Sequence, residues 1–259
     1  MKITILNDNA PGRNCLAEYG LSFLVEADKK ILFDAGATDV YLQNAKILGI
    51  SLNDIDSIVL SHGHWDHGNG LKYISGPQLI CHPDVFKRRY NKKENRYIGL
   101  NQSQRELESR FKIITSREPY KISPQIYFLG EIPRINDFEA KSTYFYHEGG
   151  QEDFVPDDSG LAVITASGIV VISGCAHAGI CNTIEYAKKV TGISVVSAVI
   201  GGFHLRTNNE QTQKTIEYFK ASGIKDIYPT HCTGLPALAQ FYNAFETYQV
   251  LAGDYFNFK

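Results

Sequence analysis

Four side chains of the kinds that bind metal ions lie within one short segment, residues 62–67, which reads His-Gly-His-Trp-Asp-His. Residues two apart in an extended chain point the same way, so His62 and His64 can bind one ion. A turn after them lets Asp66 and His67 face a second position. Imidazole and carboxylate groups suit zinc, and also manganese or iron. A polar surface loop is the alternative, but this arrangement of ligands favours a metal site.

The element that must position this segment is a strand. Residues 57–60 form an apolar, partly β-branched run that is typical of a buried strand, and Gly68 and Gly70 allow a sharp turn after the segment. Most other histidines also follow apolar strand-like runs, whereas His147 does not, so we expect one shared site. The histidines in this context are His62, His64, His67, His82, His177, His204 and His231.

Strand-like and helix-like runs alternate along the chain, which predicts an α/β fold with ligands at strand ends. Asp34 ends one of these strands, and it either orients a metal ligand or caps the next helix. We expect strands at 2–6, 21–27, 31–34, 57–60, 77–81, 126–129, 195–200 and 226–229, and a hairpin at 161–172. We expect helices at 39–48, 71–74, 102–110, 182–191, 212–222 and 236–242, and a terminal strand or tail at 248–259.

One domain is expected over residues 1–259, with an insertion or lid at 84–150. This segment is rich in lysine, arginine and tyrosine. It either covers the site or forms a solvated charged face. As a cover, its basic and aromatic groups would suit an anionic substrate with a ring.

Bulk properties narrow the function classes. The net charge of −2 argues against a dedicated nucleic-acid binder. No apolar run reaches the roughly 18 residues of a membrane span, and the N-terminus is too briefly apolar for a signal peptide. The five cysteines are odd in number and irregularly spaced, which fits a reducing compartment and a cytoplasmic location. Nothing here indicates an oligomeric state.

The chain resembles the metallo-β-lactamase superfamily over essentially its whole length. Residues 62–67 match its signature, and His177 and His231 resemble its downstream ligands. More narrowly, the segments 130–134, 173–179, 201–205 and 230–234 resemble the branch named after 7,8-dihydropterin-6-ylmethyl-4-(β-D-ribofuranosyl)aminobenzene 5′-phosphate synthase.

This resemblance implies a four-layer αββα sandwich with two metal ions, zinc first among the candidates, bridged by a hydroxide. By resemblance, the first ion would be bound by His62, His64 and His177. The second would be bound by Asp66, His67 and His231.

Two departures from the superfamily pattern affect this assignment. Many members have a histidine in the turn before the hairpin, but in this chain residues 155–160 read Val-Pro-Asp-Asp-Ser-Gly. Many members also have an aspartate that bridges the two metal ions at the end of the next strand, and this chain has Cys175 there. We expect His177 to replace the missing histidine. Cys175 is either a thiolate ligand or a small buried residue, and we favour the latter. Asp158 either ligates or orients a ligand.

We expect the chain to be a metal-dependent hydrolase in which a metal-bound hydroxide attacks an anionic, phosphorylated small molecule. Asp66 would orient or deprotonate the water, and His204 would contact substrate or protonate the leaving group, unless it is a core histidine. Arg134 and Arg206 are candidates to bind phosphate. The alternatives are a dihydropterin transferase that releases diphosphate, a non-catalytic metal-binding sensor, and a di-iron redox protein, which the lack of a flavin domain disfavours.

Overall fold

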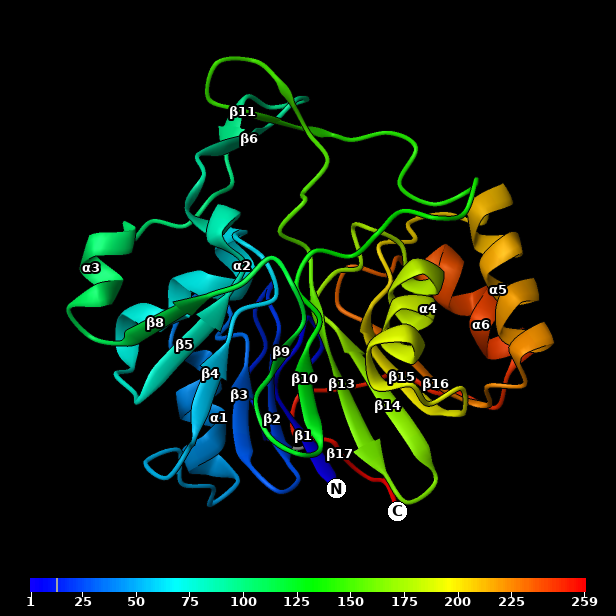
Figure 1. The fold of residues 1–259 in the computed structure, drawn as a ribbon, viewed down its shortest axis with the longest axis horizontal. Helices are drawn as coiled ribbons and strands as arrows, with labels where there is room; N and C mark the ends of the chain where they lie inside the picture. The colour runs from blue at the N-terminus through cyan, green and yellow to red at the C-terminus, as the bar shows by residue number, and fades with distance from the viewer. Residues whose placement is uncertain (13) are drawn as a thin grey trace.

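Two β-sheets pack face to face, and helices cover their outer faces (Figure 1). The computed structural model describes residues 1–12 and 14–259. The expected four-layer αββα sandwich is confirmed. Both termini lie at the same end of the sandwich, which is the lower end in Figure 1.

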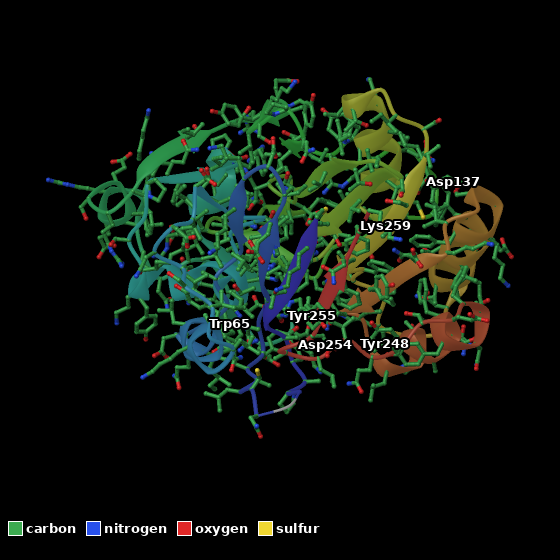
Figure 2. All side chains as sticks on the ribbon, turned by 90° about the horizontal axis from the view of Figure 1, so that it is seen from below. Trp65, Asp137, Tyr248, Asp254, Tyr255 and Lys259 are labelled. Carbon is green, nitrogen blue, oxygen red and sulfur yellow. The ribbon has the colours of Figure 1, made fainter. Side chains whose placement is uncertain are left out.

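The first sheet has seven strands in the order β17-β1-β2-β3-β4-β5-β8. Their bounds in that order are Tyr255–Asn257, Lys2–Asn7, Ser22–Glu26, Lys30–Phe33, Ser57–Val59, Gln78–Cys81 and Lys112–Thr115. Strands β3, β4, β5 and β8 are parallel, and the others pair antiparallel. The C-terminal segment supplies β17, whose Phe256 pairs with Ile3 of β1. Figure 2 labels its neighbour Tyr255 on this strand.

The second sheet has six strands in the order β16-β15-β14-β13-β10-β9. Their bounds in that order are Asp226–Thr230, Val196–Gly202, Gly168–Ser173, Gly160–Thr165, Ile126–Phe128 and Tyr120–Lys121. Strands β13 and β14 form the expected hairpin, and β14, β15 and β16 are parallel.

Most core strands are apolar on both faces, because each sheet packs against the other sheet on one face and against helices on the other. Phe33 packs between the sheets, whereas its neighbour Leu32 packs outward under the helices. In β14, Val170 faces the other sheet and Val171 faces the opposite helix layer. Side chains alternate along a strand, so a strand buried on both faces becomes a continuous apolar run. This is why these strands were recognisable in the sequence.

The helices lie on the two outer faces, with α1 beside the first sheet and α4, α5 and α6 beside the second (Figure 1). The bounds are Val40–Ile47 for α1, Trp65–Gly68 for α2, Gln104–Glu108 for α3, Ile180–Thr191 for α4, Glu210–Ser222 for α5 and Leu235–Ala244 for α6. Short 3-10 helices cover Asn69–Tyr73 and Pro83–Phe86. Within the described ranges, no helix has both the length and the apolar character needed to cross a membrane.

The helix expected at 71–74 begins earlier, inside the histidine segment. His64 is extended, with φ −89° and ψ 149°, and α2 starts at the next residue. The chain therefore changes from strand to helix between His64 and Asp66. This change gives the turn that the spacing of the ligands requires.

The boundaries of the insertion expected at 84–150 need correction. Strands β8, β9 and β10 lie inside this range but belong to the two main sheets. Strand β10 matches the strand expected at 126–129, whereas β8 and β9 are short strands in a charge-rich stretch and were not expected. The added structure is instead formed on either side of them. It contains a small sheet of β12 (Glu152–Asp153), β11 (Phe145–His147), β6 (Arg89–Asn91) and β7 (Arg96–Tyr97).

Candidate metal centre

Six histidines follow the carboxyl ends of parallel strands at one edge of the sandwich. The pairs Phe33–Val59, Ser173–Gly201 and Gly202–Thr230 set the registers that bring these ends level. The structure therefore brings together side chains from distant parts of the sequence. The group contains His62, His64 and His67 after β4, His177 after β14, His204 after β15, and His231 after β16.

His82 does not join this group, so its expected place in the shared site is wrong. Its Nε2 lies 3.4 Å from Oε2 of Glu131 and 3.3 Å from Nη1 of Arg117, and its Nδ1 accepts a hydrogen bond from the Asp84 amide. The chain turns into a 3-10 helix directly after His82, and the ring is used to cap it. His82 follows a strand in the sequence just as the clustered histidines do, so its position did not distinguish helix capping from metal binding.

Several residues at the strand ends have left-handed backbone conformations without being glycine. The φ angles are 58° at Asp34, 52° at Ala176, 50° at His204 and 52° at His231. Such a conformation costs about 1–3 kcal/mol for a residue with a side chain, and it concentrates at functional sites. Here it turns the chain sharply after each of four strands, which aims the following side chains inward.

The first ligand group contains His62, His64 and His177. Nε2 of His62 lies 2.9 Å from Nδ1 of His64, and the His177 ring centroid is 4.9 Å from each of the other two. Two nitrogens bound to one tetrahedral zinc at about 2.0–2.1 Å lie about 3.3 Å apart. The three rings therefore converge as ligands of one ion do. Nε2 of His177 is buried and, among the described residues, has no hydrogen-bond partner.

The charge state of this group fits metal binding. Burial lowers the pKa of His62, His64 and His177 well below the usual histidine value, and the neighbouring histidines and Arg89 lower it further. The rings are therefore neutral near pH 7. Neutral imidazole is the form that ligates a cation.

The second ligand group contains Asp66, His67 and His231. Nε2 of His67 lies 3.1 Å from Nε2 of His231, which is 3.4 Å from Oδ2 of Asp66. Burial opposes ionisation of Asp66, but the charges of His67 and His231 lower its pKa overall. The two groups are adjacent, since the His62 and His67 ring centroids are 4.2 Å apart.

Cys175 lies between the two groups. Its Sγ is 3.2 Å from Nε2 of His67. It also lies within 4.8 Å of ligand atoms of His62, of His177 and His204, and of His231 and Cys232. Cys175 is buried, as favoured from the sequence, but its neighbours are potential ligands and not apolar side chains. The sulfur thus lies among the candidate ligands of both groups.

Asp34 contacts His67, a candidate ligand, as one of the two roles weighed for it requires. Its Oδ2 lies 2.7 Å from Nδ1 of His67, and its two oxygens accept hydrogen bonds from the amide and hydroxyl of Ser61. It does not cap α1, whose N-cap is Asp39. A carboxylate on the far nitrogen of a ligating histidine fixes the ring and increases its basicity.

Two further supporting residues were missed in the sequence. Oδ1 of Asn9 lies 3.1 Å from Nδ1 of His231, and its Nδ2 donates to the His231 carbonyl. Oδ2 of Asp157 accepts from the Gly63 amide, between the two first histidines of the motif, and Oδ1 accepts from Arg89. Both lie in polar turn segments, a signal too common to identify them.

Asp158 supports the loop of His177 and belongs to none of the ligand groups among the described residues. Its Oδ2 accepts a hydrogen bond from the Ala178 amide at 2.9 Å. Burial raises the pKa of Asp158 to about 6. Of the two roles weighed for this carboxyl, its contacts match the positioning one.

Arg134 lies apart from the ligand groups, so its expected phosphate contact is not at this site. Its guanidinium donates to the carbonyls of Phe154 and Val155. It also lines a separate cavity with Arg117, Glu131 and other residues. The Arg134 side chain is thus occupied in holding the backbone at 154–155.

Two cavities meet at the histidine cluster. The larger one has a volume of about 500 Å³, and the smaller one about 320 Å³. Both are lined by Phe145, His177, His204 and Arg206. The larger cavity adds Tyr19, His64, Trp65, Asp66, Asn91, Lys93, Glu94, Arg96, Ile98, Cys175 and Cys232. The smaller adds polar groups that include Lys141, Thr143, Thr207, Asn209 and Gln211.

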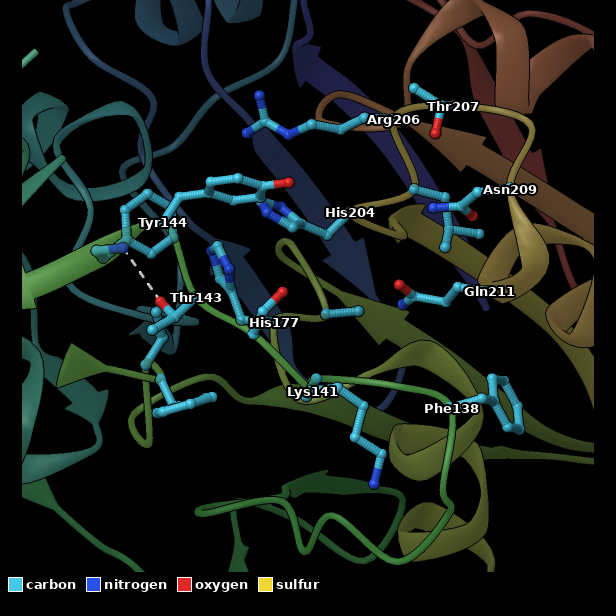
Figure 3. Close-up of a pocket in the computed structure, with 17 residues that line it drawn as sticks. Phe138, Lys141, Thr143, Tyr144, His177, His204, Arg206, Thr207, Asn209 and Gln211 are labelled. Atoms are coloured by element: carbon cyan, nitrogen blue, oxygen red, sulfur yellow. Dashed lines mark hydrogen bonds between the residues drawn. The ribbon is translucent and has the colours of Figure 1, made fainter. Parts of the chain in front are cut away.

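His204 and Arg206 stand at the junction of these cavities. The His204 ring centroid is 4.2 Å from that of His177, and its Nδ1 is buried with no hydrogen-bond partner in the part of the chain that the structure describes. Figure 3 shows His177 and His204 between Tyr144 on one side and Asn209 and Gln211 on the other. Arg206 is exposed. Both residues are placed to contact a bound molecule.

The added structure supplies walls of both cavities. Phe145 of β11 packs edge-on against His64 with centroids 4.9 Å apart. Lys93 and Arg96 border the larger cavity, and Lys141 and Tyr144 border the smaller. These contacts agree with the lid interpretation, which remains a prediction.

A family model described as the metallo-beta-lactamase superfamily matches residues 17–231. A curated protein of Methanocaldococcus jannaschii, named 7,8-dihydropterin-6-methyl-4-(beta-D-ribofuranosyl)-aminobenzene-5'-phosphate synthase, is 37% identical over 95% of this chain and 92% of its own length. The crystal structure of Tm1679, described as a metal-dependent hydrolase of the beta-lactamase superfamily, has a TM-score of 0.89. It is 30% identical, over 100% of this chain and 99% of that chain.

A diphosphatase from the PhnP family shares the fold, with a TM-score of 0.52 and 15% identity over 100% of this chain and 98% of that one. The family match spans the strands and loops that carry both ligand groups, from before the histidine motif to His231. These findings confirm the resemblance read from the motifs. The chain belongs to the metallo-β-lactamase superfamily.

Proposed function

We propose that this protein is a metal-dependent hydrolase of phosphorylated or otherwise anionic small molecules, with two divalent cations in its site. The observation that carries the proposal is the convergence of two adjacent ligand groups beside a cavity whose lining includes Lys93, Arg96 and Arg206. Zinc is the first candidate for both positions because imidazole, carboxylate and thiolate all suit it.

The residues present fit this pair of ions. His62, His64 and His177 would hold the first, and Asp66, His67 and His231 the second. When bound, such ions polarise phosphoryl oxygens and lower the pKa of water. The protein contributes the neutral imidazoles of the first group, one buried carboxylate in the second, and positioning contacts from Asp34, Asn9 and Asp157.

Side chains around the histidine cluster would bind the substrate and transfer a proton to the departing group. Lys93, Arg96 and Arg206 line the larger cavity and would bind an anionic substrate. Trp65 offers a ring face beside them, with the Arg96 guanidinium 5.9 Å from its centroid. Proton transfer to the departing group is assigned to His204, whose ring faces both cavities.

The relatives support the chemistry at different levels. The solved relative at 30% identity is described as a metal-dependent hydrolase. The curated relative at 37% identity is named as a synthase. Both names describe enzymes, and they differ in the class of reaction.

Hydrolysis can be tested with bis-p-nitrophenyl phosphate. The metal-free protein is reloaded separately with zinc, manganese and iron(II), and release of p-nitrophenol is measured. We expect turnover with at least one metal and none in His64→Ala. Arg105→Ala is the matched control, because this exposed arginine of α3 lines neither cavity, and it should keep the activity. A fully loaded protein without activity on this diester, on phosphate monoesters or on diphosphates would contradict the proposal.

Group transfer is the second candidate, and a specific observation favours it. Two cavities share the wall formed by His177 and His204, so two substrates could reach one centre through different cavities. In the dihydropterin transferase alternative, diphosphate leaves as the pterin joins an aryl amine. Diphosphate release that requires both compounds would support transfer, whereas release from the pterin diphosphate alone would support hydrolysis.

A further inference from the structure

Two cysteine sulfurs lie together at the second ligand group. The Sγ atoms of Cys175 and Cys232 and one ring nitrogen of His231 are all within 4.8 Å of one another, and all three residues are buried. Both cysteines line the larger cavity beside Asp66. The cysteines come from different strand ends, since Cys175 follows β14 and Cys232 follows β16. Neither sulfur is needed to complete the histidine and aspartate sets described above.

The surroundings of Cys232 fix its sulfur in this place. Its Sγ accepts a hydrogen bond from the His204 amide at 3.3 Å and, as a thiol, donates one to the Cys175 carbonyl at 3.5 Å. A Cβ atom on Gly202 would lie 2.6 Å from this sulfur, so only glycine leaves room for it. An N–H donor suits a sulfur that carries negative charge, as a metal-bound thiolate does.

The other cysteines have different surroundings. Cys81 and Cys181 are buried among apolar side chains of the two outer cores. Cys15 is also buried, and neither it nor Cys81 or Cys181 appears in a ligand group of the described residues. Burial of a small apolar residue accounts for these three, but not for a pair of sulfurs facing buried imidazoles.

We propose that the second metal position has sulfur ligands, with Cys175 between the two ions and Cys232 on the His231 side, and that it therefore selects a thiophilic cation. Zinc, cobalt(II) and cadmium belong to this class. Magnesium and manganese prefer oxygen ligands. This inference rests on the metal centre of the proposed function and adds its ligand chemistry and its selectivity.

Cobalt(II) loading of the full chain tests the ligands without measuring activity. A thiolate bound to cobalt gives a near-ultraviolet charge-transfer band, whereas imidazole and carboxylate ligands do not. We expect this band in the wild type, a partial loss in Cys175→Ser and in Cys232→Ser, and complete loss in the double variant with cobalt still bound. Cys15→Ser is the matched control and should keep the full band.

A measurement on the wild type alone covers the case in which a variant does not fold. Iodoacetamide is applied to metal-free and zinc-loaded protein, and modified peptides are identified by mass spectrometry. We expect zinc to protect both Cys175 and Cys232. Competition between equimolar zinc and manganese should load zinc into the wild type, and the folded double variant should take up more manganese.

The outcomes separate this inference from the proposal on which it rests. A wild type that binds cobalt without a sulfur band overturns the inference and leaves the metal centre intact. A full band in Cys232→Ser, together with no zinc protection of Cys232, overturns the role of that residue. A wild type that binds neither cobalt nor zinc contradicts the metal centre itself.

Discussion

Oδ2 of Asp34 lies 2.7 Å from Nδ1 of His67, and both side chains are fully buried. The same carboxylate accepts two hydrogen bonds from Ser61, so it is fixed from both sides. The second nitrogen of His67 points at His231 and Cys175. One carboxylate thus sets the ring orientation of a residue at the centre of the site.

Asp34→Asn should therefore weaken metal binding without removing a ligand. Loss of such an outer contact typically lowers metal affinity about 10–100-fold. Zinc affinity can be measured by competition with a coloured chelator, with the exposed Asp54→Asn as control. Equal affinity in Asp34→Asn and the control would show that Asp34 does not orient a ligand.

Gly63→Ala should displace the two histidines that flank it. A Cβ atom at this position would lie 2.0 Å from the Val85 carbonyl oxygen, which is backbone and cannot turn aside. Overpacking of this kind costs about 1–3 kcal/mol. Urea unfolding and metal titration would measure both effects. Gly76→Ala is the control, because its nearest neighbour is at 3.4 Å, and similar behaviour of the two variants would count against this argument.

Arg89→Met should be strongly destabilising. The Arg89 guanidinium is buried between Asp157 at 2.8 Å and Asp153 at 3.4 Å, and its removal leaves two carboxylates without their partner. Breaking a buried pair in this way costs about 3–5 kcal/mol. Chemical denaturation measures the change. The adjacent Arg88→Met removes an exposed ion pair with Glu148 and should leave the unfolding free energy nearly unchanged. Comparable losses of unfolding free energy in both variants would contradict the special role of the buried Arg89.

Glu139 should make stability depend on pH. Burial raises its pKa above the ordinary glutamate value, although the amides of Cys181 and Asn182 and the Asn136 side chain donate to it. The folded state therefore binds this proton more tightly than the unfolded state. Its contribution to stability is complete below the unfolded pKa of about 4.3 and decreases as pH rises through the raised value. Between pH 4 and 8, the unfolding free energy of the wild type should decrease relative to that of Glu139→Gln, since other shifted groups such as Asp158 act equally in both proteins. Parallel curves for the two proteins would contradict this role of Glu139.

Strand patterns and ligand spacing predicted much of the architecture and of the cluster. Apolar runs located the strands because the sheets are buried on both faces, and strand ends located six of the site histidines. The failures at His82 and Arg134 share a cause, since residue type and local pattern do not reveal the direction of a side chain. The contacts of Asn9 and Asp157 join segments far apart in the sequence, so no local signal marks them.

The central claim is that two adjacent ligand groups bind two metal ions. Metal content per chain, measured by inductively coupled plasma mass spectrometry after zinc loading and desalting, tests it most directly. We expect close to two zinc ions per chain in the wild type, close to one when either His64→Ala or His231→Ala disrupts one group, and close to zero when both are combined. A loaded wild type that retains well under one zinc ion per chain, or single variants that retain as much as the wild type, would contradict it.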